Sequence, residues 1–174
     1  MKTLISTPNA VRRFFCEPLS PAVWGVYRLA VGSFCLLQSL VLLPDLLLHY
    51  GQNGLVAGQI SDGLASPYVP TLGKLFSIFS TILRGSSTDA DVFVYVFYTA
   101  FLLVLVGFTV GFKTPTMAFL AWLMHLTLVN TERLGAYGVE MFCNIALFYA
   151  VFSPTGQAFS VDSRRRCFEP SEFT

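Results

Sequence analysis

Four long apolar stretches follow one another along the chain, and polar or glycine- and proline-rich segments separate them. They cover about residues 21–43, 91–111, 115–130 and 137–153. In the first stretch, about twenty apolar residues in an α-helix would cover the ~30 Å hydrocarbon core of a bilayer. Pro21 suits the start of this helix, and Pro44-Asp45 ends or kinks it. The pattern therefore predicts an all-α integral membrane protein in which four transmembrane helices form a bundle.

A shorter segment, from Leu72 to about Arg84, has a different pattern. Its apolar positions recur at spacings of three and four, at Leu72, Leu75, Phe76, Phe79, Ile82 and Leu83. Polar residues take most of the other positions, so the segment is predicted to be an amphipathic helix. It is too short, and too polar on one side, to span a bilayer. We expect it to lie in the membrane interface.

The composition agrees with a membrane setting. Of the 174 residues, 54% are hydrophobic and 12% are charged, whereas an ordinary soluble domain has about 25% charged residues. A net charge of +1 and the lack of a basic, aromatic-rich stripe argue against nucleic acid as a partner. Membrane lipids and other integral membrane subunits are the predicted partners. The sequence also lacks the nucleophile-elbow, P-loop, zinc-protease and dinucleotide-binding motifs of soluble enzymes.

The distribution of lysine and arginine predicts the orientation, because cytoplasmic segments carry an excess of these residues. With the N-terminus inside, the outer side holds only Lys74, Arg84 and Arg133, and the cytoplasmic side holds Lys2, Arg12, Arg13, Lys113 and Arg164 to Arg166. We therefore expect a cytoplasmic lead-in over 1–18, a transmembrane domain over 19–162 and a cytoplasmic tail over 163–174. The predicted location is the bacterial inner membrane, in a multi-pass protein.

This topology gathers polar residues near the outer ends of the helices. The gathered residues are Asp45, His49, Asn130, Arg133, Tyr137, Glu140 and Asn144, of which the last three share one helical face. In a structural interpretation, Arg133 pairs with Asp45 or Glu140 and holds the helix ends together. In a functional one, the cluster is a ligand-binding pocket for the polar headgroup of a quinone or a lipid, since ionisable groups are costly inside a membrane.

Other polar residues and thiols lie deeper in the predicted spans. Arg28 either snorkels to the cytoplasmic headgroups or pairs inside the bundle. His125 either ligates a pigment or haem from one side or forms a hydrogen bond inside the bundle. The predicted position of His49, nearer the outer surface, disfavours a bis-histidine haem. Cys35 and Cys143 lie in apolar runs without metal-type spacing, so we expect small hydrophobes and no metal site.

A set of short motifs spreads over about residues 19–162. They are Arg28, Tyr50, Gly54, the Gly107–Lys113 turn, Asn130, Gly138-Val139-Glu140, Pro154-x-Gly156 and Ser160-Val161-Asp162. In their order and spacing the chain resembles the HTTM family, the horizontally transferred transmembrane domain related to vitamin K-dependent gamma-carboxylase. The resemblance implies a shared helical scaffold.

The resemblance does not extend to the family's catalytic region. In the true carboxylases further membrane segments follow, and a lysine there is the proposed base that deprotonates a vitamin K hydroquinone. This chain ends a dozen residues after Asp162, and Lys2, Lys74 and Lys113 match no such position. Gly138-Val139-Glu140 also stands where the family usually has Gly-Gly-Asp. We therefore expect a truncated version without catalytic residues, or a fragment of a longer carboxylase-like protein.

Two functional hypotheses follow. The leading one is a non-catalytic accessory or structural subunit of a larger membrane complex, for example a photosynthetic or respiratory assembly. The alternative is a reduced gamma-carboxylase-like enzyme, or a quinone- or lipid-binding protein that uses the outer polar cluster. The residues alone assign no cofactor, and the candidates are a quinone, a lipid and a bound pigment.

Overall fold

The computed structural model describes residues 20–51, 54, 68–82, 90–132, 138–156 and 158–161. In these ranges the chain is helical and contains no strand, which confirms the predicted all-α class. The predicted lead-in over 1–18 and tail over 163–174 lie outside the described residues. Arg133 and Tyr137 of the predicted polar cluster lie outside them as well.

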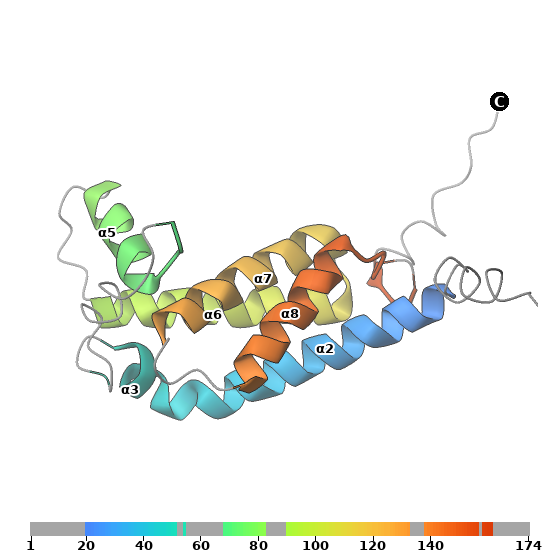
Figure 1. The fold of residues 1–174 in the computed structure, drawn as a ribbon, viewed down its shortest axis with the longest axis horizontal. Coiled ribbons are helices and arrows are strands. Elements are labelled where there is room, and N and C mark those ends of the chain that lie inside the picture. The colour runs from blue at the N-terminus through green and yellow to red at the C-terminus, as the bar shows by residue number, and fades with distance from the viewer. Residues whose placement is uncertain are drawn as a thin grey trace, which may run out of the picture.

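Each predicted apolar stretch contains a helix, and the bounds agree to within a few residues. The first is α2 (Pro21–Leu42), which continues through the 3-10 turn η1 (Leu43–Asp45) into the short helix α3 (Leu46–Tyr50). The amphipathic segment is α5 (Leu72–Ile82). The remaining long helices are α6 (Ala90–Val110), α7 (Thr114–Thr131) and α8 (Gly138–Phe152) (Figure 1).

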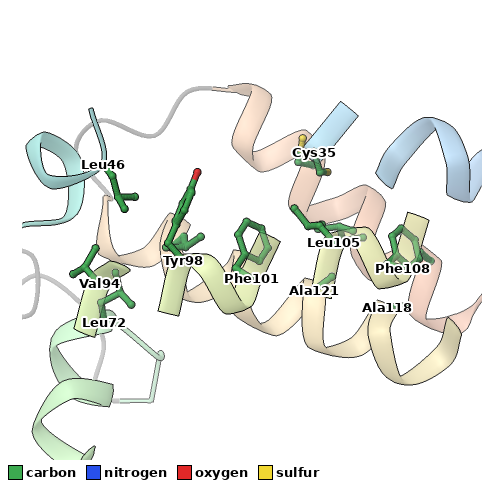
Figure 2. Packing of buried hydrophobic residues seen from close by; sticks show 14 residues of the cluster. Cys35, Leu46, Leu72, Val94, Tyr98, Phe101, Leu105, Phe108, Ala118 and Ala121 are labelled. Carbon is green, nitrogen blue, oxygen red and sulfur yellow. The ribbon is translucent and has the colours of Figure 1, made fainter. Parts of the chain in front are cut away.

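The four long helices pack in a closed order, in which α2 contacts α6 and α8, and α7 contacts the same two helices. The core between them holds mainly side chains of α6 and α7, including Tyr98, Phe101, Leu105, Phe108, Ala118 and Ala121 (Figure 2). Small buried residues follow one face of α7 and one of α8, at Ala118, Ala121, Cys143, Ala146 and Ala150. Small side chains at these spacings let two helix backbones approach closely.

The first helix bends at Pro44, as the sequence predicts. Proline has no N–H to donate to the preceding turn, and its ring clashes with that turn. The helix tightens into η1, where the Leu43 N–H bonds to the Leu40 carbonyl three residues back. The Tyr98 hydroxyl donates to the Ser39 carbonyl at 2.7 Å. The bend therefore turns α3 toward α6 and brings His49 and Tyr50 to one end of the helix assembly.

The amphipathic helix α5 lies at the same end as α3 (Figure 1). Its first backbone N–H, on Leu72, donates to the Thr131 hydroxyl at the end of α7 at 2.9 Å. Leu72 is buried against the core, and the rings of Phe76 and Phe79 each lie 5.5 Å from the ring of Phe93 between centroids, whereas Ser77 and Thr81 are exposed. This arrangement agrees with an amphipathic helix, and its place in a membrane interface stays a prediction.

Among the described residues, two helices are long and apolar enough to cross a membrane, Pro21–Tyr50 and Ala90–Val110. Helix α8 is apolar but has 15 residues, which extend only about 22 Å at 1.5 Å per residue. Helix α7 contains His125, Asn130 and several threonines, which lower its hydropathy. The predicted count of four transmembrane spans therefore stays a prediction.

Candidate functional site

A cavity of about 100 Å³ lies where the bend after α2 meets the facing ends of α6, α7 and α8. Its apolar walls include Leu42, Phe101, Leu128 and Val129. Its polar lining comes from every neighbouring helix: Gln38 and Ser39 from α2, His49 and Tyr50 from α3, Tyr98 from α6, His125 from α7 and Glu140 from α8, with Glu132 directly after α7. The cavity has room for several waters.

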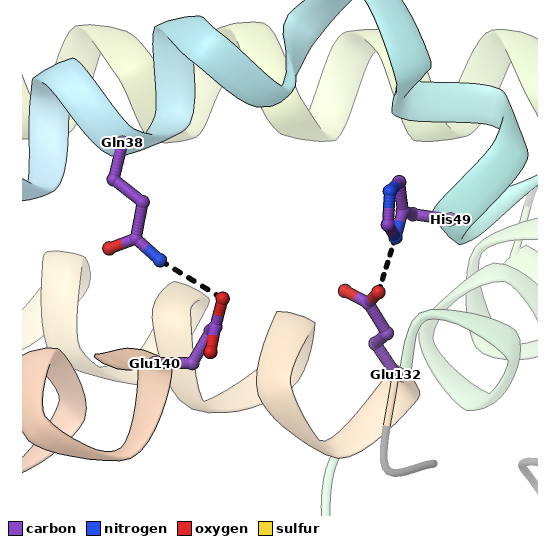
Figure 3. Close-up of polar contacts among 4 residues, drawn as sticks. All are labelled: Gln38, His49, Glu132 and Glu140. Carbon is purple, nitrogen blue, oxygen red and sulfur yellow. Dashed lines mark hydrogen bonds and ion pairs between the residues drawn. The ribbon is translucent and has the colours of Figure 1, made fainter. Parts of the chain in front are cut away.

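One side of the cavity is closed by a pair between α3 and the end of α7. His49 Nδ1 contacts Glu132 Oε1, and both side chains are partly buried (Figure 3). The bend at Pro44 is what carries His49 to this place. The sequence places Glu132 at the outer end of the third predicted span but not in the predicted ligand-binding cluster, and its partner becomes apparent only when α3 folds back against α7.

The opposite side of the cavity is closed by the side-chain amide of Gln38, which joins α2 to α8. Gln38 Nε2 donates to Glu140 Oε1 at 3.1 Å (Figure 3). The same amide accepts a hydrogen bond at Oε1 from the Cys143 thiol, at 3.2 Å. Gln38 therefore uses both ends of its side chain across the helix interface. It holds the Glu140 carboxylate at the cavity wall.

His125 lines the cavity and is buried, with 7% of its surface exposed. Its Nδ1 has no hydrogen-bond partner among the described residues, and neither has the buried Oδ1 of Asn144. The Asn144 side chain lies beside the imidazole, and the Phe101 ring packs 6.0 Å from it between centroids. Buried polar atoms without partners are uncommon and call for an explanation. Here the two atoms belong to neighbouring side chains, so a small rotation of either one would join them in a hydrogen bond.

The structure brings only part of the predicted polar cluster together. His49 and Glu140 line the cavity, and Asn144 lies beside His125. Asp45 is exposed on η1 and does not line the cavity. Asn130 donates from Nδ2 to the Leu126 carbonyl of its own helix at 2.7 Å. The predicted ion pairs of Arg133 lie outside the described residues, so they stay predictions.

Arg28 lies at the other end of the molecule, fully buried. Its guanidinium donates to the carbonyls of Thr155 at 2.7 Å and Phe159 at 2.6 Å, and at 3.3 Å to those of Thr109 and Ala158. Of the two predicted alternatives for Arg28, the structure therefore supports bonding inside the helix assembly. A buried charge is tolerated when such partners satisfy it. Arg28 ties the segment after α8 to α2 and α6.

Glycine makes room for this guanidinium. Gly111 ends α6 with a φ of 80°, a conformation that side-chain-bearing residues rarely adopt. A Cβ at Gly111 would lie 2.5 Å from Ser160 Cβ and 2.8 Å from Arg28 Nη1. Glycine at position 111 therefore lets the guanidinium of Arg28 pass close to the backbone that ends α6.

The arrangement at the cavity suits hydrogen bonding rather than metal binding. Within the described ranges, no group of three or more His, Cys, Asp or Glu side chains could hold a metal ion. No protein-family model, no curated protein and no solved structure matches the chain. The site offers two carboxylates, each held by a side chain of a facing helix, and one buried imidazole beside Asn144.

Proposed function

We propose that the chain is a multi-pass protein of the bacterial inner membrane with an HTTM-like scaffold, four spans and both ends in the cytoplasm. Its support is the outer surface, where all four long helices expose large apolar side chains. Among the most exposed are Val26, Leu37, Val41, Val96, Leu103, Phe142, Tyr149 and Phe152. Contiguous apolar surface of this kind is unusual on a soluble monomer. Lipid, or the helices of another membrane subunit, would cover it.

A second observation supports the HTTM-like scaffold. The motif residue Arg28 and the segment 154–160, which are far apart in the sequence, meet in the structure. The Arg28 guanidinium reaches the Thr155, Ala158 and Phe159 carbonyls, and Ser160 packs near Gly111. Motif residues that fold to one place have a common structural reason to occur together. In this proposal their role is to hold the scaffold, since they lie away from the cavity.

Within this scaffold, the function that we propose is binding of the polar headgroup of a quinone or a lipid in the cavity. The observation that carries it is the polar cavity lined by Glu132, Glu140 and the buried His125, whose Nδ1 has no hydrogen-bond partner in the described part of the chain. A headgroup hydroxyl or carbonyl would supply the missing hydrogen bond. An unmade buried hydrogen bond costs about 1–3 kcal/mol, so a matching ligand gains that much at this atom.

The other polar residues would orient the headgroup. Gln38 holds Glu140, and His49 holds Glu132, so both carboxylates are kept at the wall in defined positions. A carboxylate accepts hydrogen bonds from hydroxyl groups. Leu42, Leu128 and Val129 would contact the apolar part of the ligand where it leaves the cavity. These roles are positional, and we assign no catalytic residue.

Measuring the quinone and lipid that stay bound to the purified protein tests the binding proposal. The protein is isolated in a mild detergent, and mass spectrometry quantifies the quinone and lipid bound per chain. We expect one of the two in stoichiometric amount, lost in Glu140→Ala. Asp45→Ala is the matched control, because it removes an exposed carboxylate that does not line the cavity. Equal ligand content in both variants, or no stoichiometric ligand in the unaltered protein, would contradict the proposal.

A non-catalytic accessory subunit of a larger membrane complex is the second candidate. The aromatic surface of α8 favours it, because Phe142, Phe148, Tyr149 and Phe152 are all exposed. Phe148 contacts Tyr149 and Phe152, with ring centroids 6.2 Å and 5.0 Å away. Such a cluster suits packing against a further helix. Isolation of a stable monomer without any stoichiometric membrane partner would count against this candidate and would leave the binding proposal untouched.

A further inference from the structure

Two thiols meet inside the interface of α2 and α8. Cys35 and Cys143 are free and are 2% and 1% exposed. Gln38 lies one turn after Cys35 on the same face of α2, and its Oε1 receives the Cys143 thiol at 3.2 Å. The Cys35 and Cys143 side chains interact directly across the interface, and Cys35 belongs to the packed core (Figure 2). The sequence predicts only two separate small hydrophobes at these positions.

We propose that this pair is a modification site, where a peroxide oxidises Cys35 and Cys143 to a disulfide that joins α2 to α8. The reaction balances with hydrogen peroxide as the oxidant. One thiol gives a sulfenic acid as the O–O bond breaks and a water leaves. The second thiol then attacks that sulfur, so that the S–S bond forms and a second water leaves. Two S–H hydrogens thus end in water, and the peroxide is reduced by two electrons.

The position of the pair explains how an oxidant arrives. Gln38 contacts the Cys143 thiol and also lines the cavity, so a single side chain separates the cavity from the sulfur. Hydrogen peroxide is small and uncharged. A local opening of the Gln38 side chain would therefore admit it without unfolding of the helices. Each thiol already has the other as its neighbour, so the sulfenic acid is resolved at once into the disulfide.

Oxidation also changes the wall of the cavity. The Cys143 sulfur of a disulfide has no hydrogen to donate, so Gln38 Oε1 loses the donor that holds it. Gln38 Nε2 in turn holds Glu140, and this carboxylate becomes less firmly positioned. If the cavity binds a headgroup as proposed above, the oxidised protein binds it less tightly, by about two- to tenfold for one hydrogen bond. The disulfide itself does not depend on that ligand.

Mass spectrometry of the full-length protein in detergent tests the modification. The other two cysteines, Cys16 and Cys167, are first replaced by serine, so that the proposed pair holds the only thiols. After treatment with hydrogen peroxide, we expect both thiols to become unreactive toward an alkylating reagent, whereas oxidation of methionine adds oxygen without changing the thiol count. Proteolysis should then release a cross-linked peptide containing Cys35 and Cys143, which a reductant separates. Cys35→Ser in the same background is the control, and it should give no internal cross-link.

Several results would contradict the proposed disulfide. They are thiols that remain fully alkylatable after peroxide, oxidation of either cysteine to sulfinic or sulfonic acid without a disulfide, and cross-links only between chains. The mapping needs no variant at Cys35 or Cys143, so it stands even if Cys35→Ser fails to fold. A second measurement compares binding of a short-chain ubiquinone analogue before and after oxidation. A disulfide without any change in binding would uphold the modification and contradict only its link to the cavity.

Discussion

The two ends of the helix assembly both bury polar groups, and they do so in opposite ways. At one end, the Arg28 guanidinium donates to four backbone carbonyls. At the other, the His125 imidazole lines a cavity with a nitrogen that no described residue bonds. A polar group whose partners are supplied by the chain holds the fold together. The His125 imidazole ties no segment of the described chain in this way, and in the proposed function a headgroup would bond to it.

Arg28→Ala is the substitution with the largest expected effect, since it strips several buried carbonyls of their donor at once. Removing one partner of a buried charged network costs about 3–5 kcal/mol. We expect a sharp fall in the unfolding temperature, measured by thermal scanning in detergent. Arg28→Lys keeps the charge but not the planar fork of donors. Its unfolding temperature should therefore lie between those of the unaltered protein and Arg28→Ala. An unchanged unfolding temperature in Arg28→Ala would contradict the structural role that we assign to Arg28.

Gly111→Ala tests the same end through its backbone. A φ of 80° and a Cβ only 2.5 Å from Ser160 make the substitution strained, at a cost of about 1–3 kcal/mol. Gly138→Ala is the matched control, because a Cβ at Gly138 meets nothing within 4 Å. Comparing the unfolding temperatures of the two variants isolates the close approach. Equal losses in both would show that glycine is not required at Gly111 by the contact with Arg28.

Tyr98→Phe should have the smallest effect, because it deletes one hydroxyl and keeps the ring. The lost bond to the Ser39 carbonyl, 2.7 Å long, contributes about 0.5–1.5 kcal/mol. We expect a small fall in unfolding temperature. Helical content, followed by circular dichroism, should not change. A loss as large as that of Arg28→Ala would mean that the bend after α2, rather than the segment after α8, is the main support of the fold.

The hydrophobic pattern predicts the helices well because each apolar run is a local property. The helix bounds and the bend at Pro44 follow from residues close together in the chain. The site does not, because it depends on which helix faces meet. His49 contacts Glu132 over a sequence separation of 83 residues. Gln38 bonds to Glu140 and to Cys143 over separations of 102 and 105 residues. No periodicity within a single helix contains that information.

The residues of the predicted polar cluster illustrate the same limit. Glu140 and His49 were recognisable because ionisable groups stand out against apolar helices. Tyr98 and Gln38 did not stand out, since aromatic and amide side chains are ordinary in such segments. For Arg28 the sequence left two alternatives, because it does not show that the segment after α8 returns to the start of α2. Only the packed structure separates a structural cation from one that faces the headgroups.

His125→Leu, followed in one preparation by unfolding temperature and by bound quinone or lipid, tests the contrast between the two ends most directly. The substitution keeps a similar volume and removes a buried nitrogen that lacks a partner among the described residues. We expect a ligand-free protein whose unfolding temperature, compared with the ligand-stripped parent, is equal or higher. A collapse of stability like that of Arg28→Ala, or an undiminished ligand content, would contradict it.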